Sequence, residues 1–192
     1  DLPPERRWIV GVDDHVAPPS ALLREGLADS LAIMGARSDA SRLANGDTGQ
    51  DFANHVVRAL LARAKADAPR RLWASLADVL PLLAEAAPDV VLEVMDAGLA
   101  GDRPALVTLF RDADQASVLF ASSPHTGLLW ALENLAWSSD HLGHAALLLA
   151  RLSRLDPGGK LGNRPNGSLR EVFMLWHPQT AASLEQRLAV LD

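Results

Sequence analysis

Apolar residues recur at helical spacing along most of the chain. Residues 20–36 place Leu23, Leu27, Leu31 and Met34 on one face, which is the spacing of an amphipathic α-helix. Comparable stripes predict helices over 49–66, 70–87, 104–111, 124–137 and 140–155, another that starts after Pro88, and a last one with Leu184, Leu188 and Leu191. Pro81 falls inside the 70–87 stripe, so we expect a kink or a break there. The pattern is therefore typical of an all-α protein.

Capping residues mark several of the expected helix starts. Thr48 with Asp51 and Ser168 with Glu171 match the capping box, in which a hydroxyl and a carboxylate three residues later bond reciprocally to backbone N–H groups. Ser123 stands before a proline and can cap the helix that follows. These signals predict helix starts just after each of the three hydroxyl residues.

Pairs of helices joined by a short turn recur along the chain. Three such pairs are expected, over 72–100, 124–155 and 168–192. Their turns, at Asp89, Asp140 and Gln179, are about 51 and then about 39 residues apart. Helical hairpins with a period of roughly 40–47 residues are typical of HEAT and armadillo arrays. We therefore expect an all-α, HEAT/armadillo-like array of antiparallel helical hairpins; a compact irregular helical bundle is the alternative.

Composition narrows the choice of fold and partner. Leu and Ala make up about a third of the chain, Val, Ile and Thr about a tenth, and Tyr is absent, which favours helix over sheet. The net charge of −6 argues against a nucleic-acid partner. No apolar run reaches the roughly 18 residues of a membrane span, so we expect no membrane contact and a cytoplasmic protein. Cys is absent, which excludes disulfides and thiolate chemistry.

The first residues lack a helical pattern. Trp8, Ile9, Val10 and Val12 predict a short extended segment, and a Pro-Pro pair follows at positions 18–19. The chain opens without an initiator Met, and its last helix is expected to run to the final residue. We therefore expect residues 1–192 to be a single helical domain excised from a larger protein.

Several short motifs in the last part of the chain carry a family resemblance. They are SSPHTGLLWALE at 122–133, LAWS at 135–138, DPGG at 156–159, NRP at 163–165 and WHPQT at 176–180. With these motifs, residues 122–192 resemble a HEAT-like helical-repeat region of very large uncharacterised bacterial multidomain proteins. The resemblance implies that some relatives carry, elsewhere in the chain, a nucleotide-binding domain of the STAND type used in signalling or phage-defence NTPases. It implies no catalytic residue.

One helix face within this region combines aromatic and polar side chains. Trp130, Glu133, Asn134 and Trp137 fall at i, i+3, i+4 and i+7, so they share a face of the 124–137 helix. Trp is a preferred anchor at interfaces, and a carboxylate between two indoles suits an Arg or Lys of a partner. In the alternative interpretation the indoles pack in the core and Glu133 is paired internally.

The loop over 156–167 adds Arg164 to the candidate residues. The loop is rich in hydrogen-bonding groups for a connector, so we expect it to fold back over the hairpin ends and present Arg164. The alternative is structural, with Arg164 paired to Glu133 or Asp156. The Gly158-Gly159-Lys160 run does not match a phosphate-binding loop, because no Ser or Thr follows the lysine and a helix precedes the run.

No constellation with a metal or a catalytic signature stands out. His141 and His144 lie one turn apart, but a zinc site needs a third ligand and the HExxH pattern is absent. No Gly-x-Ser-x-Gly elbow is present either. We therefore expect neither a catalytic residue nor a cofactor.

Together these features favour a non-enzymatic scaffold or recognition module. Its binding residues are predicted to be Trp130, Glu133, Asn134, Trp137 and Arg164, and its partner a protein or another domain of the parent chain. The alternative function is a small-ligand-binding or enzymatic helical domain with a site near Trp130, Glu133 and Arg164. A third interpretation is a spacer or oligomerising arm.

Overall fold

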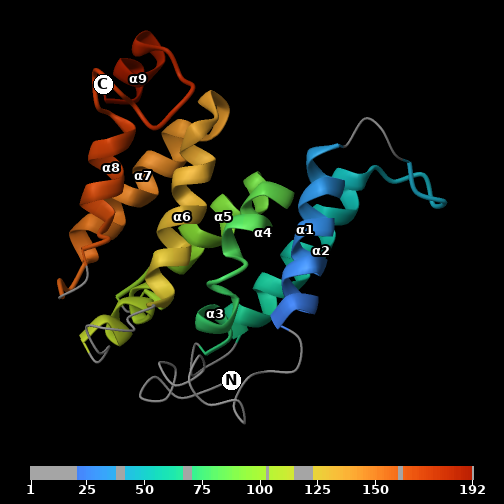
Figure 1. Cartoon of the computed structure of the whole chain (residues 1–192). Helices are drawn as coiled ribbons and strands as arrows, with labels where there is room; N and C mark the ends of the chain where they lie inside the picture. The colour runs from blue at the N-terminus through green and yellow to red at the C-terminus, as the bar shows by residue number, and fades with distance from the viewer. Residues whose placement is uncertain are drawn as a thin grey trace.

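The described residues fold mainly into helices. The computed structural model describes residues 21–37, 42–66, 71–102, 104–114, 123–159 and 162–191 (Figure 1). Their elements are α1 (Ala21–Ala36), α2 (Gly49–Ala66), α3 (Arg71–Leu76), α4 (Leu80–Ala86), α5 (Pro88–Gly98), the 3₁₀ helix η2 (Ala105–Asp114), α6 (Pro124–Trp137), α7 (Ser139–Leu155), α8 (Pro165–Val172) and α9 (Leu184–Leu191). These ranges contain no strand, only an isolated bridge between Arg42 and Thr48. The protein is therefore all-α, as the sequence predicts.

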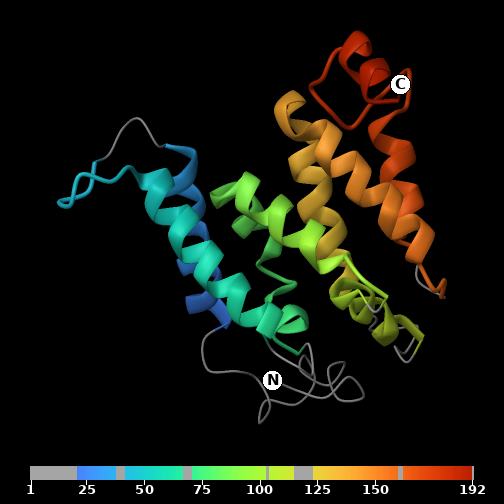
Figure 2. The ribbon, with the colours of Figure 1, turned by 180° about the vertical axis from the view of Figure 1, so that it is seen from behind.

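The helices pack in two layers that run side by side along the molecule. In one layer α1 packs against α4, α4 against α6, and α6 against α8, so these helices follow one another across Figure 1. In the other layer α2 packs against α5, α5 against α7, and α7 against α9; Figure 2 looks onto α2, α5 and α7. Contacts between the layers pair α1 with α2, α4 with α5, and α6 with α7.

The predicted interruption at Pro81 is a complete break. Helix α3 ends at Leu76, a turn covers 77–79, and α4 begins at Leu80 with Pro81 in its first turn. Proline is favoured there because it lacks the N–H that the first turn leaves unpaired. A second proline, Pro88, starts α5 directly after α4, so the α4–α5 corner is tight.

Two glycines allow neighbouring helices to approach closely within the first layer. A Cβ atom on Gly35 of α1 would lie 2.1 Å from the Ala86 carbonyl oxygen of α4. A Cβ atom on Gly127 of α6 would lie 1.8 Å from the Ala77 carbonyl oxygen in the turn before α4. Both distances are far below van der Waals contact, so no larger residue fits at either crossing without a backbone shift.

Ion pairs link successive helices of the second layer. Arg58 of α2 bonds to Glu93 of α5 at 2.9 Å, and Arg151 of α7 bonds to Asp96 of α5. These side chains are about half exposed, so each pair contributes roughly 0–1 kcal/mol to stability. The stability of the packing therefore comes from the continuous apolar core, in which Trp73 and Phe110 are the largest fully buried side chains.

Two of the predicted capping signals have different outcomes. The Thr48–Asp51 box is confirmed: the Thr48 N–H donates to Asp51 Oδ2 at 3.0 Å, and the Asp51 N–H donates to Thr48 Oγ1 at 3.1 Å. The Ser168–Glu171 box is wrong, because α8 already begins at Pro165 and Ser168 lies inside it. Proline at the first helical position is the stronger start signal there.

The last helix also differs from its prediction. Its stripe of Leu184, Leu188 and Leu191 faces solvent, and Arg187 is the buried side chain of α9, donating from Nη1 to the Met174 carbonyl at 2.9 Å. A reciprocal bond pair between Ser183 and Gln186 caps this helix instead. The extended segment predicted at Trp8–Val12 lies outside the described residues.

No described helix combines the length and the apolar character that a membrane crossing requires.

Candidate functional site

Helix α6 is buried on most sides and exposes one narrow face. It contacts α4, α7, α8 and η2, which explains why apolar residues surround almost its whole circumference. Trp130 and Trp137 are 55% and 57% exposed, Asn134 is exposed, and Glu133 is half-buried. The four residues therefore share a solvent-facing side of α6, and the indoles are not core packing.

A pocket of about 360 Å³ opens beside this face. Its walls come from α6, α8 and the segment after α8, and its lining residues are Glu133, Asn134, Trp137, Ser168, Glu171 and Gln179. Two backbone bonds fix the segment after α8: Gln179 N–H donates to the Glu171 carbonyl at 3.1 Å, and Ala181 N–H donates to the Trp137 carbonyl at 2.9 Å. The pocket is therefore built by residues more than 40 positions apart.

The pocket is acidic. Both of its charged residues, Glu133 and Glu171, are carboxylates, and no basic residue lines it. Burial raises the pKa of Glu133, and repulsion from the Glu171 carboxylate raises it further, whereas the neighbouring Ser168 hydroxyl lowers it. A cation bound between the two carboxylates would offset their repulsion and so stabilise the ionised form of Glu133.

A buried hydroxyl in the pocket wall lacks a hydrogen bond of ordinary geometry. Ser168 is 3% exposed, and its Oγ has no such partner among the described residues, although it lies near enough to Glu133 to lower the pKa of that carboxyl. Buried polar groups are nearly always hydrogen-bonded. The Glu133 carboxyl is therefore the group toward which the Ser168 hydroxyl acts in the pocket wall.

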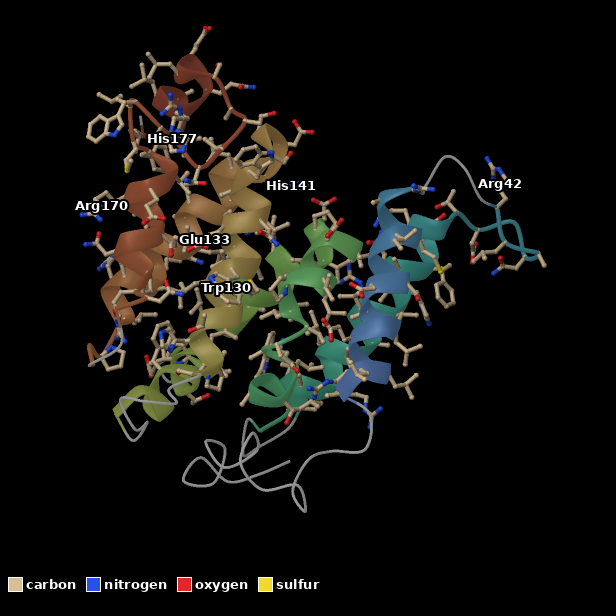
Figure 3. The ribbon with its side chains drawn as sticks, viewed as in Figure 1. Arg42, Trp130, Glu133, His141, Arg170 and His177 are labelled. Carbon is tan, nitrogen blue, oxygen red and sulfur yellow. The ribbon has the colours of Figure 1, made fainter. Side chains whose placement is uncertain are left out.

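Trp130 belongs to the same face but not to the pocket. Figure 3 shows Trp130 and Glu133 on α6, with Arg170 on the opposite side of α8. Trp130 precedes Glu133 by about one helical turn and lies outside the pocket lining. It can therefore contact a ligand that extends along the helix beyond the pocket, but not one confined within it.

Arg164 lies in a different cluster, at the start of α6. Its Nε donates to Asp156 Oδ2 at 2.9 Å, its Nη2 bonds to the second oxygen of the same carboxylate, and the guanidinium lies 5.5 Å from the centre of the Phe110 ring. The side chains of Arg164 and Asp156 are only 16% and 14% exposed. This matches the structural alternative with Asp156 as the partner, and the arginine is not presented to solvent.

His125 completes that cluster. Its ring stacks on Phe110 with centroids 4.9 Å apart, and its Nδ1 and Nε2 bond to Ser123 Oγ at 2.6 Å and to the Asn163 carbonyl at 2.9 Å. Burial is the main cause that lowers the pKa of His125. Because Ser123 Oγ bonds to the imidazole, it does not cap α6 as predicted, although Ser123 occupies the N-cap position. The Asn163 carbonyl is therefore anchored to the first turn of α6.

The histidine pair on α7 shows no ligand geometry. His141 Nε2 lies 3.3 Å from Asp89 Oδ1 at the start of α5, whereas His144 is exposed. The described part of the chain holds no group of three side chains that could bind a metal ion.

The structure thus brings together three of the five predicted binding residues and adds three others. Glu133, Asn134 and Trp137 line the pocket, whereas Trp130 lies beside it and Arg164 apart from it. The sequence analysis missed Ser168, Glu171 and Gln179 as pocket residues. In the sequence, Ser168 and Glu171 stand out only as a capping pair, and Gln179 only as a predicted turn within the WHPQT motif.

Comparison of the chain with protein-family models, with curated proteins and with solved structures finds no significant match.

Proposed function

We propose that this chain is a non-enzymatic recognition module of HEAT-like architecture, and that it binds a cationic side chain of a protein segment in the pocket beside α6. The occupant is an Arg or Lys side chain, supplied by a partner protein or by another domain of the parent chain. The observation that carries the proposal is a pocket with two carboxylates and no basic residue.

The packing order supports the HEAT-like part of the proposal. Successive helices of each layer contact their neighbours, and α1 with α2, α4 with α5 and α6 with α7 pair across the layers, as in stacked hairpins. Helix α8 packs across the layers on α7. The short α3 and the 3₁₀ helix η2 are insertions in this scheme. Stacked hairpins build extended surfaces, and the face of α6 lies on such a surface.

The exposed indoles favour a protein segment over a small molecule. Trp137 forms one wall of the pocket, and Trp130 lies further along α6, so a chain that follows the helix can contact both. Trp side chains are enriched among interface residues that dominate binding energy, and a cation over an indole face adds about 0.5–2 kcal/mol. Trp137 beside two carboxylates offers both interactions to one side chain.

A small cationic ligand is the second candidate, and the raised pKa of half-buried Glu133 favours it. A perturbed carboxyl in a cavity is typical of ligand and active sites. The version with Arg164 has no geometric support, because that guanidinium is paired with Asp156. His144 does not line the pocket either.

Fluorescence polarisation with defined peptides tests the proposal. Three labelled pools of 12-residue peptides are used, with random flanks and a fixed central Arg, Lys or Glu. We expect the Arg or Lys pool to bind at least tenfold more tightly than the Glu pool, and Glu133→Gln to remove most of this preference. Equal binding of the three pools would contradict the proposal. Binding of the free amines agmatine and cadaverine as tightly as the peptides would favour the small-ligand alternative.

A further inference from the structure

Trp130 and the acidic pocket are two contact points along one exposed face of α6 (Figure 3). Trp130 is 55% exposed and lies outside the pocket lining. The α6 residues that line the pocket, Glu133, Asn134 and Trp137, follow it by three, four and seven positions. At roughly 1.5 Å per residue they lie about 4.5–10.5 Å further along the helix axis. A ligand that reaches both points must therefore bridge about 7–8 Å, the middle of this range.

Two residues of an extended chain bridge nearly this distance. Residues at i and i+2 of an extended segment point to the same side, and they are about 6.6–6.8 Å apart at roughly 3.3–3.4 Å per residue. An Arg or Lys in the pocket therefore places the side chain two positions away over the Trp130 indole. An aromatic side chain gains most there, because aromatic rings attract one another beyond the area that they bury.

Exposed amides in the pocket favour an extended segment over a helical one. The side chains of Asn134 and Gln179 line the pocket, and neither amide is hydrogen-bonded within the described part of the chain. Each amide offers a donor and an acceptor, which match the N–H and C=O groups that an extended backbone leaves unpaired. A helical ligand pairs its own backbone groups, and it would bring a body about 10 Å wide to a face that lies between α4 and α8.

A second hollow differs from the acidic pocket in its chemistry. It is an apolar groove of about 660 Å³ between α1 and α2, and Leu27 and Phe52 are among its lining residues. The charged residue in this lining, Arg24, is bonded to Asp78, and no carboxylate lines the groove among the described residues. The apolar groove therefore offers no partner to an Arg or Lys, whereas the acidic pocket does.

We propose that the partner of the acidic pocket is an extended segment with an aromatic residue two positions before or after its Arg or Lys. The cation lies in the pocket, the aromatic ring packs on Trp130, and the backbone between them bonds to the Asn134 amide. This proposal rests on the cation-binding function, because the cation in the pocket fixes the register of the segment.

Fluorescence polarisation with position-scanned peptides tests the spacing. Pools of 12-residue peptides carry a fixed central Arg, random flanks without other aromatic residues, and a fixed Phe at one to four positions before or after the Arg. We expect Phe at two positions, on at least one side, to tighten binding at least fivefold over the pool without Phe, and Phe at the other spacings to change it less than twofold. A largest gain at three or four positions, as a helical ligand would give, or an equal gain at all spacings would overturn the proposal.

The same measurement separates this proposal from the cation-binding function. A pool with Glu in place of the central Arg is measured in parallel. If the Arg pools still bind more tightly than the Glu pool but the position of Phe has no effect, the spacing is wrong and the cation-binding function stands. Equal binding of the Arg and Glu pools would overturn both.

Substitutions in the protein locate the contact of the Phe side chain. Trp130→Ala should reduce the fivefold advantage of Phe to less than twofold and retain the preference for Arg over Glu. Asn134→Leu, which is similar in size but cannot form hydrogen bonds, should weaken binding of the best pool about threefold; an unchanged affinity would contradict an extended segment.

Leu27→Asp in the apolar groove is the matched control. Leu27 is 63% exposed, and its substitution should leave the advantage of Phe unchanged, with circular dichroism confirming the fold of each variant. If Leu27→Asp unfolds, Leu23→Asp in the same groove replaces it. Loss of the advantage in the groove variant but not in Trp130→Ala would place the Phe side chain in the apolar groove and overturn the proposal.

Discussion

The acidic pocket beside α6 and the apolar groove between α1 and α2 arise from similar Leu-rich helices in different positions. Helix α6 has neighbours on nearly all sides, and the two polar residues of its second half, Glu133 and Asn134, mark the face left open. Helix α1 is the first described helix of its layer, and no other described helix covers part of its leucine stripe. The same apolar pattern therefore forms core in the middle of the two layers and an exposed surface at the end of the described helices.

The sharpest way to test this comparison is the same Gly→Ala change in both regions. Gly127→Ala in α6 would place a Cβ atom 1.8 Å from the Ala77 carbonyl oxygen, so we expect it to destabilise the protein by about 3 kcal/mol. Gly26→Ala in α1 meets no atom within 4 Å, so we expect a stabilisation of about 0.5–1 kcal/mol from helix propensity. Urea denaturation measures both. A loss below about 1 kcal/mol for Gly127→Ala would contradict the close crossing of α6 with the α3–α4 turn.

The second prediction tests whether Arg164 stabilises the fold or contacts the ligand. Asp156→Asn leaves the largely buried Arg164 guanidinium without its carboxylate, so we expect a loss of about 2–3 kcal/mol in the free energy of unfolding. The control is Glu93→Gln, which breaks the exposed pair with Arg58 and should cost less than about 1 kcal/mol. Binding of the cationic peptide pool should be unchanged in Asp156→Asn under conditions where that variant is folded. A tenfold loss of peptide binding would mean that Arg164 or its loop contacts the ligand after all.

How far the sequence predicts each region depends on how local the information is. Helix positions followed from the spacing of apolar residues, and Pro81 marked the α3–α4 break, because both are properties of a few consecutive residues. Similarly, the spacing of Trp130, Glu133, Asn134 and Trp137 was sufficient to place them on one face.

The wrong and missing predictions concern residues whose surroundings depend on segments far away in the sequence. Ser168 and Glu171 satisfy the capping-box spacing, but residues at i and i+3 also share a face inside a helix, and that is how they come to line the pocket together. The stripe on α9 has the spacing of a core face, yet it is exposed because no described helix packs on it. Gln179 reaches the pocket through backbone bonds to distant residues, which no local pattern encodes.

Removing the charge of Glu133 then tests whether the acidic pocket, unlike the apolar groove, recognises a charged ligand. Glu133→Gln should weaken binding of the Arg or Lys peptide pool about tenfold, because a hydrogen bond to a charged group contributes roughly 1.5–3 kcal/mol. Glu25→Gln on the exposed side of α1 is the matched control and should leave binding unchanged. Isothermal titration calorimetry measures both. An unchanged affinity in Glu133→Gln would remove the electrostatic basis of the proposed function.

The same variant has a defined pH dependence. Because burial raises the pKa of Glu133, the folded protein holds the proton more tightly than the unfolded chain does. Ionised Glu133 therefore lowers stability as the pH rises through the raised pKa, and this loss is absent where both states are protonated. Glu133→Gln should raise the melting temperature at pH 7, by a few degrees at most, and the gain should shrink as the pH is lowered toward 4. Binding of the Arg pool by the unsubstituted protein should weaken over the same interval, since protonation removes the charge.

The smallest predicted effect compares the two indoles. Trp137 lines the pocket and Trp130 does not, so Trp137→Ala should weaken binding of an isolated cation such as agmatine about threefold, in line with a cation–π contribution of about 0.5–1 kcal/mol at an exposed site. Trp130→Ala should leave agmatine binding unchanged but weaken the 12-residue peptides, because only an extended ligand reaches it. If both substitutions affect agmatine equally, Trp130 must lie over the pocket when ligand is bound, and the division of the α6 face into a cation pocket and a peptide contact would be wrong.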